Sequence, residues 1–235
     1  GVPMRFETIA VHDGSEKDPA TGAVAPPIHL STTFEHGPAG EIPRGFMYIR
    51  EGNPTGEKLE EALAALDGGQ AALALASGLA ATSAILQALP QGAHVLYPDD
   101  VYYGMRVMAK DYLPRWGMDS TAVDMGDPEN VRRALRPNTK LIWAESPSNP
   151  LMKVADLAVL GEVARGAGAH LVVDGTFASP ALQRPLDLGA VAVVHSTTKY
   201  LGGHSDVQGG SIAFKERGEL YEKALHVRYI LGAVA

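Results

Sequence analysis

The chain has 235 residues, 46% of them hydrophobic, which is enough for one large or two modest domains with a buried core. Its formal net charge of −7 argues against nucleic acid or an anionic membrane surface as the main partner. The chain has no cysteine, which excludes disulfides, thiolate metal ligands and cysteine nucleophiles. Without a signal peptide or a long apolar run, the sequence predicts a cytoplasmic protein.

Residues 1–52 differ in composition from the rest of the chain. They are rich in proline and glycine and lack sustained hydrophobic periodicity. We therefore expect an extended N-terminal arm rather than a domain. Composition alone leaves open whether such an arm is disordered or wraps around a partner subunit.

Residues 53–235 alternate between helical and strand patterns and form the predicted main domain. Helices are expected over 54–66, 77–89, 104–114, 128–135, 156–167 and 218–230, and strands over 94–97, 141–144, 171–173 and 191–194. The apolar runs of the strands are continuous rather than alternating, as in strands that helices cover on both faces. The pattern predicts an α/β fold with a parallel sheet.

A group of reactive side chains follows the last predicted strand. Lys199 lies there between His195 and His204, with hydroxyl side chains on both sides of it. Ligands of open parallel sheets bind beyond the carboxyl ends of the strands. A lysine at that edge suits covalent chemistry with a carbonyl group.

Three further places have both a functional and a plain structural interpretation. Ser77 and Gly78 open a predicted helix, where backbone N–H groups bind phosphate, although Ser77 also suits an ordinary N-cap. Asp174 ends a strand and suits a protonated ring nitrogen, a metal or a turn cap. Asn149, between two prolines, is either an oriented amide or part of a rigid loop.

Two other chemistries find little support in the sequence. His195, His204 and Asp206 have a spacing that no single helix or strand would align, so we predict no metal site. The G-x-S-x-G motif of serine hydrolases is absent around both Ser196 and Ser205.

Taken together, these positions match the requirements of pyridoxal 5′-phosphate (PLP). Its aldehyde needs an amine, here Lys199, and its ring nitrogen needs a carboxylate, here Asp174. Its phosphate needs hydrogen-bond donors at a helix start. The candidates for that role are Ser77, Gly78, Ser196 and Thr198.

Six motifs along the chain also resemble a known family. They are YxRxxNPT at 48–55, SGLA at 77–80, DVYYG at 100–104, ESPSNP at 145–150, DGTFASP at 174–180 and HSTTKYLGGHSD at 195–206. In type and order they are similar to those of the Cys/Met-metabolism PLP enzymes. That family includes cystathionine γ-synthase, cystathionine γ- and β-lyases, methionine γ-lyase and O-acylhomoserine sulfhydrylases.

The resemblance implies the large domain of a fold-type I PLP enzyme, with a mostly parallel sheet flanked by helices, and it assigns roles to particular residues. Lys199 would hold PLP covalently and move protons, Asp174 would pair with the ring nitrogen, and Tyr102 would stack on the ring. The motif leaves open whether Tyr103 does so instead. The phosphate would be held by Gly78, Leu79, Ser196 and Thr198.

The resemblance also implies a homo-oligomer with shared sites. Tyr48 and Arg50 would reach the phosphate in the neighbouring subunit, which makes the arm a dimer element, and the family resemblance implies a tetramer. Asn149 would lie near the 3′-oxygen of the cofactor and the substrate carboxylate.

The sequence departs from the family pattern at a few positions. Gly175 and Gly202 stand where asparagine is common, and Leu79 replaces a common methionine but would contribute only its backbone N–H. The lack of cysteine makes methionine γ-lyase a weaker match. The apolar end at 231–235 fits a chain cut before a C-terminal domain of about 100–150 residues.

The sequence therefore predicts an enzyme of trans-sulfuration that carries out β- or γ-elimination or γ-replacement. Cystathionine γ-synthase or γ-lyase is the first expectation. O-acylhomoserine sulfhydrylase, cystathionine β-lyase and methionine γ-lyase are alternatives. A non-enzymatic alternative is a scaffold that binds PLP without turnover.

Overall fold

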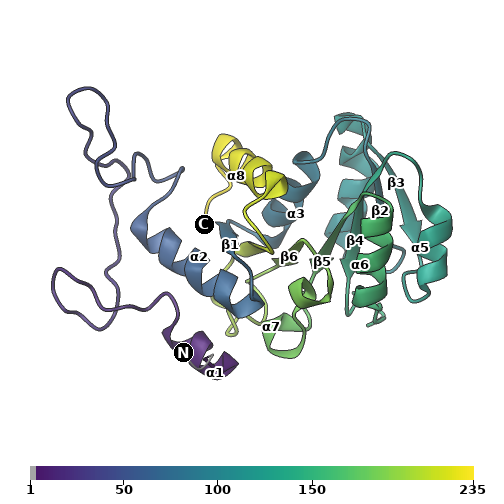
Figure 1. Cartoon of the computed structure of the whole chain (residues 1–235), viewed down its shortest axis with the longest axis horizontal. Helices are drawn as coiled ribbons and strands as arrows, with labels where there is room; N and C mark the ends of the chain where they lie inside the picture. The colour runs from purple at the N-terminus through teal and green to yellow at the C-terminus, as the bar shows by residue number, and fades with distance from the viewer. Residues whose placement is uncertain (1–3) are drawn as a thin grey trace.

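A seven-stranded sheet lies between two layers of helices in the computed structural model, which describes residues 4–235 (Figure 1). The strand order is β1-β7-β6-β5-β4-β2-β3. The strands are β1 (Ala71–Leu75), β2 (His94–Pro98), β3 (Asp119–Val123), β4 (Thr139–Glu145), β5 (His170–Asp174), β6 (Ala192–His195) and β7 (Gly210–Phe214). The α-helices are α1 (Phe6–His12), α2 (Pro54–Asp67), α3 (Gly78–Gln87), α4 (Tyr103–Val107), α5 (Pro128–Ala134), α6 (Leu157–Gly166), α7 (Ser179–Leu182) and α8 (Glu219–Leu231).

Local signals set the bounds of the long helices. The side chain of Asn53 accepts a hydrogen bond from the Gly56 N–H at 2.9 Å and caps α2, whose first residue is Pro54. Gly68 ends α2 in the left-handed conformation with φ of +71°, which glycine adopts without steric cost. The predicted helix over 54–66 is therefore present almost as expected.

The core is divided by the sheet into two apolar layers. Leu73 of β1 packs with Ile85 of α3 on one face, in the layer that α8 also covers. Ala72 of the same strand faces the other layer, which also contains Leu63 of α2 and Leu160 of α6. Because both faces are covered, the inner strands are buried except at a few positions, such as His170 at the start of β5, which explains their continuous apolar runs.

Three strands are missing from the sequence-based prediction, and one of them is the single antiparallel member of the mostly parallel sheet that a fold-type I enzyme implies. β1, β3 and β7 were not expected, and β7 runs antiparallel to both of its neighbours, β1 and β6, so that the sheet is mixed. The other adjacent pairs are parallel. The helix expected over 104–114 is divided into α4 and a π-helical turn, Met108–Tyr112.

The N-terminal segment loops away from the sheet (Figure 1). Residues 13–53 contain no helix or paired strand beyond an isolated bridge between Thr33 and Tyr48. The segment is tied to α2 by an ion pair between Glu16 and Lys58 at 2.9 Å. Helix α1, which the sequence-based prediction did not include, packs beside α2.

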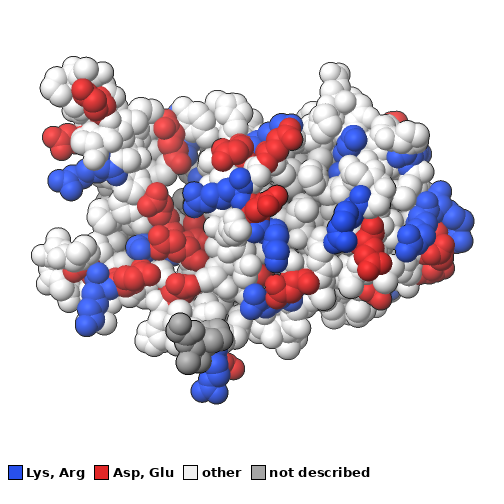
Figure 2. Space-filling model, viewed as in Figure 1, with Lys and Arg blue, Asp and Glu red and all other residues white. Residues whose placement is uncertain are grey.

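Acidic and basic side chains are interspersed on the face that Figure 2 shows. In residues 4–235, no helix combines the length and the apolarity that crossing a membrane requires.

Candidate active site

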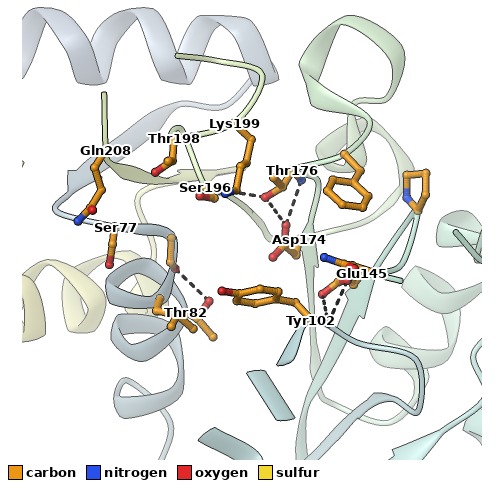
Figure 3. Close-up of a pocket in the computed structure, with 15 residues that line it drawn as sticks. Ser77, Thr82, Tyr102, Glu145, Asp174, Thr176, Ser196, Thr198, Lys199 and Gln208 are labelled. Atoms are coloured by element: carbon orange, nitrogen blue, oxygen red, sulfur yellow. Dashed lines mark hydrogen bonds between the residues drawn. The ribbon is translucent and has the colours of Figure 1, made fainter. Parts of the chain in front are cut away.

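Strands β4, β5 and β6 end at one edge of the sheet, beside the turn that joins β1 to α3. A cavity of about 270 Å³ opens there, close to the lower end of the roughly 300–1,000 Å³ typical of small-molecule sites. It is lined by Ser77, Gly78, Leu79, Thr82, Tyr102, Glu145, Pro147, Asn149, Asp174, Thr176, Phe177, Ser196, Thr198, Lys199 and Gln208 (Figure 3). All the predicted site residues except Tyr48 and Arg50 line this cavity.

One wall of the cavity is the start of α3. The Ser77 hydroxyl accepts a hydrogen bond from the Ala80 N–H at 3.1 Å, so Ser77 is the N-cap of this helix. A Cβ atom on Gly78 would lie 2.8 Å from Cβ of Ser196. Only glycine lets the helix start come this close to the turn after β6. The first N–H groups of α3 and its positive dipole end favour an anion at this wall.

The turn after β6 carries the other candidate phosphate ligands. The Ser196 N–H donates to the Thr176 hydroxyl at 2.9 Å. The Thr198 hydroxyl donates to the Gly209 carbonyl at 3.2 Å and accepts from the Gly209 N–H at 3.1 Å. The Thr198 hydroxyl proton is therefore engaged within the chain. The Thr198 side chain would have to rotate before its hydroxyl could donate to a ligand.

Lys199 lies in the same turn as these residues. Its N–H donates to the Ser196 carbonyl at 3.1 Å, and its own carbonyl accepts from the Gly203 N–H at 2.8 Å. These two bonds hold the backbone of the turn. In Figure 3 the lysine side chain reaches into the cavity from above, across from Tyr102.

Asp174 ends β5 at the centre of the cavity. Its Oδ1 accepts hydrogen bonds from the N–H of Thr176 at 3.0 Å and from the Thr176 hydroxyl at 2.6 Å. Burial raises the pKa of Asp174, and the hydrogen bonds from Thr176 and the nearby His195 oppose that rise. A cation placed beside this carboxyl group would favour its ionised form.

Glu145 is a second buried carboxyl group at this edge, and the sequence analysis assigned it no role. It ends β4 and is paired in register with Asp174. Burial, followed by the charge of Asp174, raises the pKa of Glu145 to about 8. The sequence did contain a signal for this pair, because two apolar strand patterns that lie side by side in the sheet each end in an acid.

Tyr102 and Tyr103 differ in their relation to the cavity. Tyr102 lines it, whereas Tyr103 is 74% exposed and does not. Figure 3 shows the Tyr102 ring at the opposite side of the cavity from Lys199, with Asp174 between them. Of the two tyrosines, Tyr102 has the geometry for stacking on a bound ring.

Tyr48 and Arg50 lie outside the cavity. The Arg50 guanidinium packs between two aromatic rings, 5.4 Å from the centre of Tyr48 and 5.1 Å from that of Tyr229 in α8. Its Nε atom is buried and has no hydrogen-bond partner among the described residues. Tyr48 and Arg50 are thus held together at the base of the arm, where the arm meets α2, close to the C-terminal helix α8.

The two histidines of the lysine segment do not line the cavity. His195 is buried with Asp67, and its Nε2 lies 3.0 Å from Oδ1 of that aspartate. His204 is exposed, and its Nδ1 lies 3.4 Å from the Gly202 carbonyl oxygen. The pair with Asp67 accounts for the burial of His195.

Thr176 and Gln208 are cavity residues to which the sequence analysis gave no role. Thr176 joins two strand ends, because its hydroxyl bonds both Asp174 and the Ser196 N–H. The Gln208 amide donates to the Ala76 carbonyl at 3.2 Å. Gln208 precedes β7, an unpredicted strand, so nothing in the sequence placed it at this edge.

The sequence matches one family model along nearly its whole length. The model of the Cys/Met metabolism PLP-dependent enzymes covers residues 7–235. The chain is 46% identical over 228 residues to cystathionine gamma-synthase of Mycobacterium tuberculosis, covering 97% of this chain and 58% of that protein. It is 47% identical over 219 residues to cystathionine gamma-lyase of Bacillus subtilis, covering 92% of this chain and 57% of that protein.

A solved structure shares the fold. The crystal structure of cystathionine gamma-lyase from Lactobacillus plantarum, complexed with L-serine, superposes with a TM-score of 0.94 at 39% identity. The match covers 98% of this chain and 60% of the other. This chain thus spans less than two thirds of the length of these proteins.

Proposed function

This chain belongs to the Cys/Met metabolism PLP-dependent enzymes, and from that membership we propose that the whole protein acts on sulfur-containing amino acids. The proposed reaction is a β- or γ-elimination or a γ-replacement on cystathionine or a homoserine ester. We favour the activities named for the two curated relatives, cystathionine gamma-synthase and gamma-lyase. Cystathionine β-lyase, O-acylhomoserine sulfhydrylase and methionine γ-lyase are the alternatives.

The observation that best supports this proposal is the set of groups around one cavity. The start of α3 offers backbone N–H groups for a phosphate, and the lack of a Cβ at Gly78 lets the turn after β6 approach this helix start. The buried carboxyl group of Asp174 suits a protonated ring nitrogen, and the amine of Lys199 suits an aldehyde. These are the donor, acid and amine that PLP requires.

When bound, PLP supplies an electron sink for negative charge at the α-carbon of the substrate. In this proposal Asp174 keeps the proton on the ring nitrogen, because a cation there compensates for the burial of the carboxylate. Lys199 would hold the cofactor until the amine of the substrate displaces it. The freed amine of Lys199 would then accept the proton from the α-carbon and return it where the substituent leaves. Tyr102 packs on the ring and assists as acid or base.

The proposal includes an assembly of at least two subunits. Tyr48 and Arg50 are placed together at the base of the arm and outside the cavity of their own chain. We assign them to the phosphate of a neighbouring subunit, with residues 1–52 as the arm that reaches it. The same proposal extends to a tetramer.

Product analysis of the protein supplied with PLP tests the proposed reaction. Cystathionine, methionine, and O-succinylhomoserine with cysteine would be given separately. Release of 2-oxobutyrate indicates γ-elimination, pyruvate from cystathionine indicates β-elimination, and new cystathionine indicates γ-replacement. Bound cofactor with no product from any substrate would instead support the scaffold that binds PLP without turnover.

A further inference from the structure

Two loops at the carboxyl edge of the sheet are joined by two buried carboxyl groups, Asp100 in one loop and Glu145 at the end of the strand before the other. One loop follows β2 and contains Asp100 and Tyr102. The other follows β4 and begins directly after Glu145. Glu145 is 7% exposed and Asp100 is 6% exposed, so neither carboxyl group can rely on bulk water to satisfy its oxygens.

Glu145 bonds the backbone of both loops. Its Oε1 and Oε2 lie 3.1 and 3.0 Å from the N–H of Tyr102, across 43 positions of sequence. Its Oε1 also accepts from the N–H of Asn149 at 2.7 Å. Both donor residues, Tyr102 and Asn149, line the cavity, so one carboxyl group fixes two residues of the site through their backbones.

Asp100 makes the reciprocal connection from the first loop to the second. Its Oδ2 accepts from the Ser148 hydroxyl at 2.5 Å and from the Leu151 N–H at 3.0 Å. The Ser148 oxygen in turn accepts from the Lys153 N–H at 2.9 Å. The segment that carries Asn149 is therefore held on one side by Glu145 and on the other by Asp100.

We propose that Glu145 is a positioning residue that, together with Asp100, clasps the two loops so that Tyr102 and Asn149 face the cofactor cavity. The inference rests on the proposed PLP site. The Tyr102 side chain forms no hydrogen bond among residues 4–235, and Figure 3 shows Glu145 beside its backbone with the ring projecting into the cavity. Because Glu145 holds the Tyr102 N–H, it fixes the backbone position from which the Tyr102 ring projects.

The electrostatic cost of this arrangement argues that it serves the site. Glu145 faces Asp174 from β5 and Asp100 from the loop after β2, and both carboxylates disfavour a further negative charge. The geometry accounts for the acid: Oε1 of Glu145 accepts from both the Tyr102 N–H and the Asn149 N–H, and Oε2 also lies within reach of the Tyr102 N–H.

A double-mutant cycle on cofactor affinity tests the clasp. The dissociation constant of PLP is measured for the full chain, Glu145→Ala, Tyr102→Ala and the double variant. Loss of two buried backbone hydrogen bonds predicts that Glu145→Ala weakens PLP binding about tenfold. Because that effect passes largely through the Tyr102 ring, it falls to about threefold or less in the Tyr102→Ala background.

Further variants separate positioning from folding. Glu145→Gln keeps the shape and one acceptor, and it is expected to restore most of the lost affinity. Glu162→Ala, at an exposed position of α6, is the matched control and leaves the affinity unchanged. Circular dichroism of each variant reports whether the fold is intact.

The outcomes distinguish this inference from the proposed function. If the unaltered chain binds no PLP, the proposed function fails. If it binds PLP and Glu145→Ala has the same full effect with and without the Tyr102 ring, Glu145 does not position that ring and the clasp is wrong. Unchanged affinity in a folded Glu145→Ala variant also overturns the clasp.

Discussion

At the scale of single residues, Glu145 and Asp174 link the stability of the fold to pH. The pKa of Glu145 is raised from an ordinary value near 4.5 to about 8, chiefly by burial. Between these two values the folded chain keeps a proton that the unfolded chain releases. The free energy of unfolding therefore falls as pH rises through this window.

Replacing Glu145 with glutamine removes this titration. We expect the cofactor-free protein to lose a few kcal/mol of unfolding free energy between about pH 5 and pH 8, and Glu145→Gln to lose clearly less. Urea unfolding at both pH values measures the difference. Asp174 contributes with the same sign and remains in the variant, so the slope should shrink without vanishing. Equal slopes in the two proteins would contradict the raised pKa of Glu145.

The buried pair of Asp67 and His195 gives a second prediction for single residues. Both side chains are at most 1% exposed, and the ring nitrogen of His195 lies 3.0 Å from the carboxylate. Asp67→Ala leaves that nitrogen without a partner, which costs about 1–3 kcal/mol of unfolding free energy. Asp67→Asn keeps an acceptor oxygen and should cost less. Urea unfolding that ranks the two variants equally would argue against the pair.

At the scale of elements, the contact between the start of α3 and the turn after β6 depends on one glycine. A methyl group at Gly78 would lie 2.8 Å from Cβ of Ser196, so Gly78→Ala must push the helix start and the turn apart. We expect lower stability by about 1–3 kcal/mol and weaker PLP binding, measured by unfolding and by titration.

Gly166, at the end of α6, provides the matched control. A Cβ atom there would have nothing within 4 Å, and its φ is not in the left-handed region. Gly166→Ala should leave PLP affinity unchanged and be neutral or stabilising by about 0.4–1 kcal/mol. If both variants behave alike, the close approach at Gly78 has no role in binding.

The elements that the sequence predicted are those with strong local signals. Helix α2 has a capping asparagine, a proline at its first position and a glycine at its end, and it was expected within one residue of its observed bounds. β1 was missed because its run Ala71–Leu75 lacks β-branched residues and matches a helix as well as a strand. β3 is an edge strand with mostly exposed or half-buried residues, so its pattern is weak.

The cavity was predictable in part because each candidate followed a strand or opened a helix. Lys199, Asp174 and the Ser77-Gly78 turn fit that rule, and parallel strand ends share one edge. Glu145 was overlooked although it obeys the same rule, because its partners Tyr102 and Asn149 are bound through backbone N–H groups. Such contacts do not depend on residue type and leave little trace in a sequence.

At the scale of the whole molecule, the base of the arm offers a test of the proposed assembly. Arg50 is held between Tyr48 and Tyr229 but does not line the cavity of its own chain. If it binds the phosphate in a neighbouring subunit, Arg50→Ala should weaken PLP affinity about tenfold or more. Arg44→Ala, at an exposed position of the arm, is the control. Full PLP affinity in Arg50→Ala would rule out the shared site.

The central claim is that Lys199 holds PLP covalently. Its most direct test is borohydride reduction of the protein loaded with PLP, followed by peptide mass spectrometry to locate the attached pyridoxyl group. We predict one labelled residue, Lys199, together with a visible absorbance band that disappears in Lys199→Ala but persists in Lys215→Ala. The claim would be contradicted if several lysines carried the label and if the unaltered chain and Lys199→Ala were labelled to the same extent.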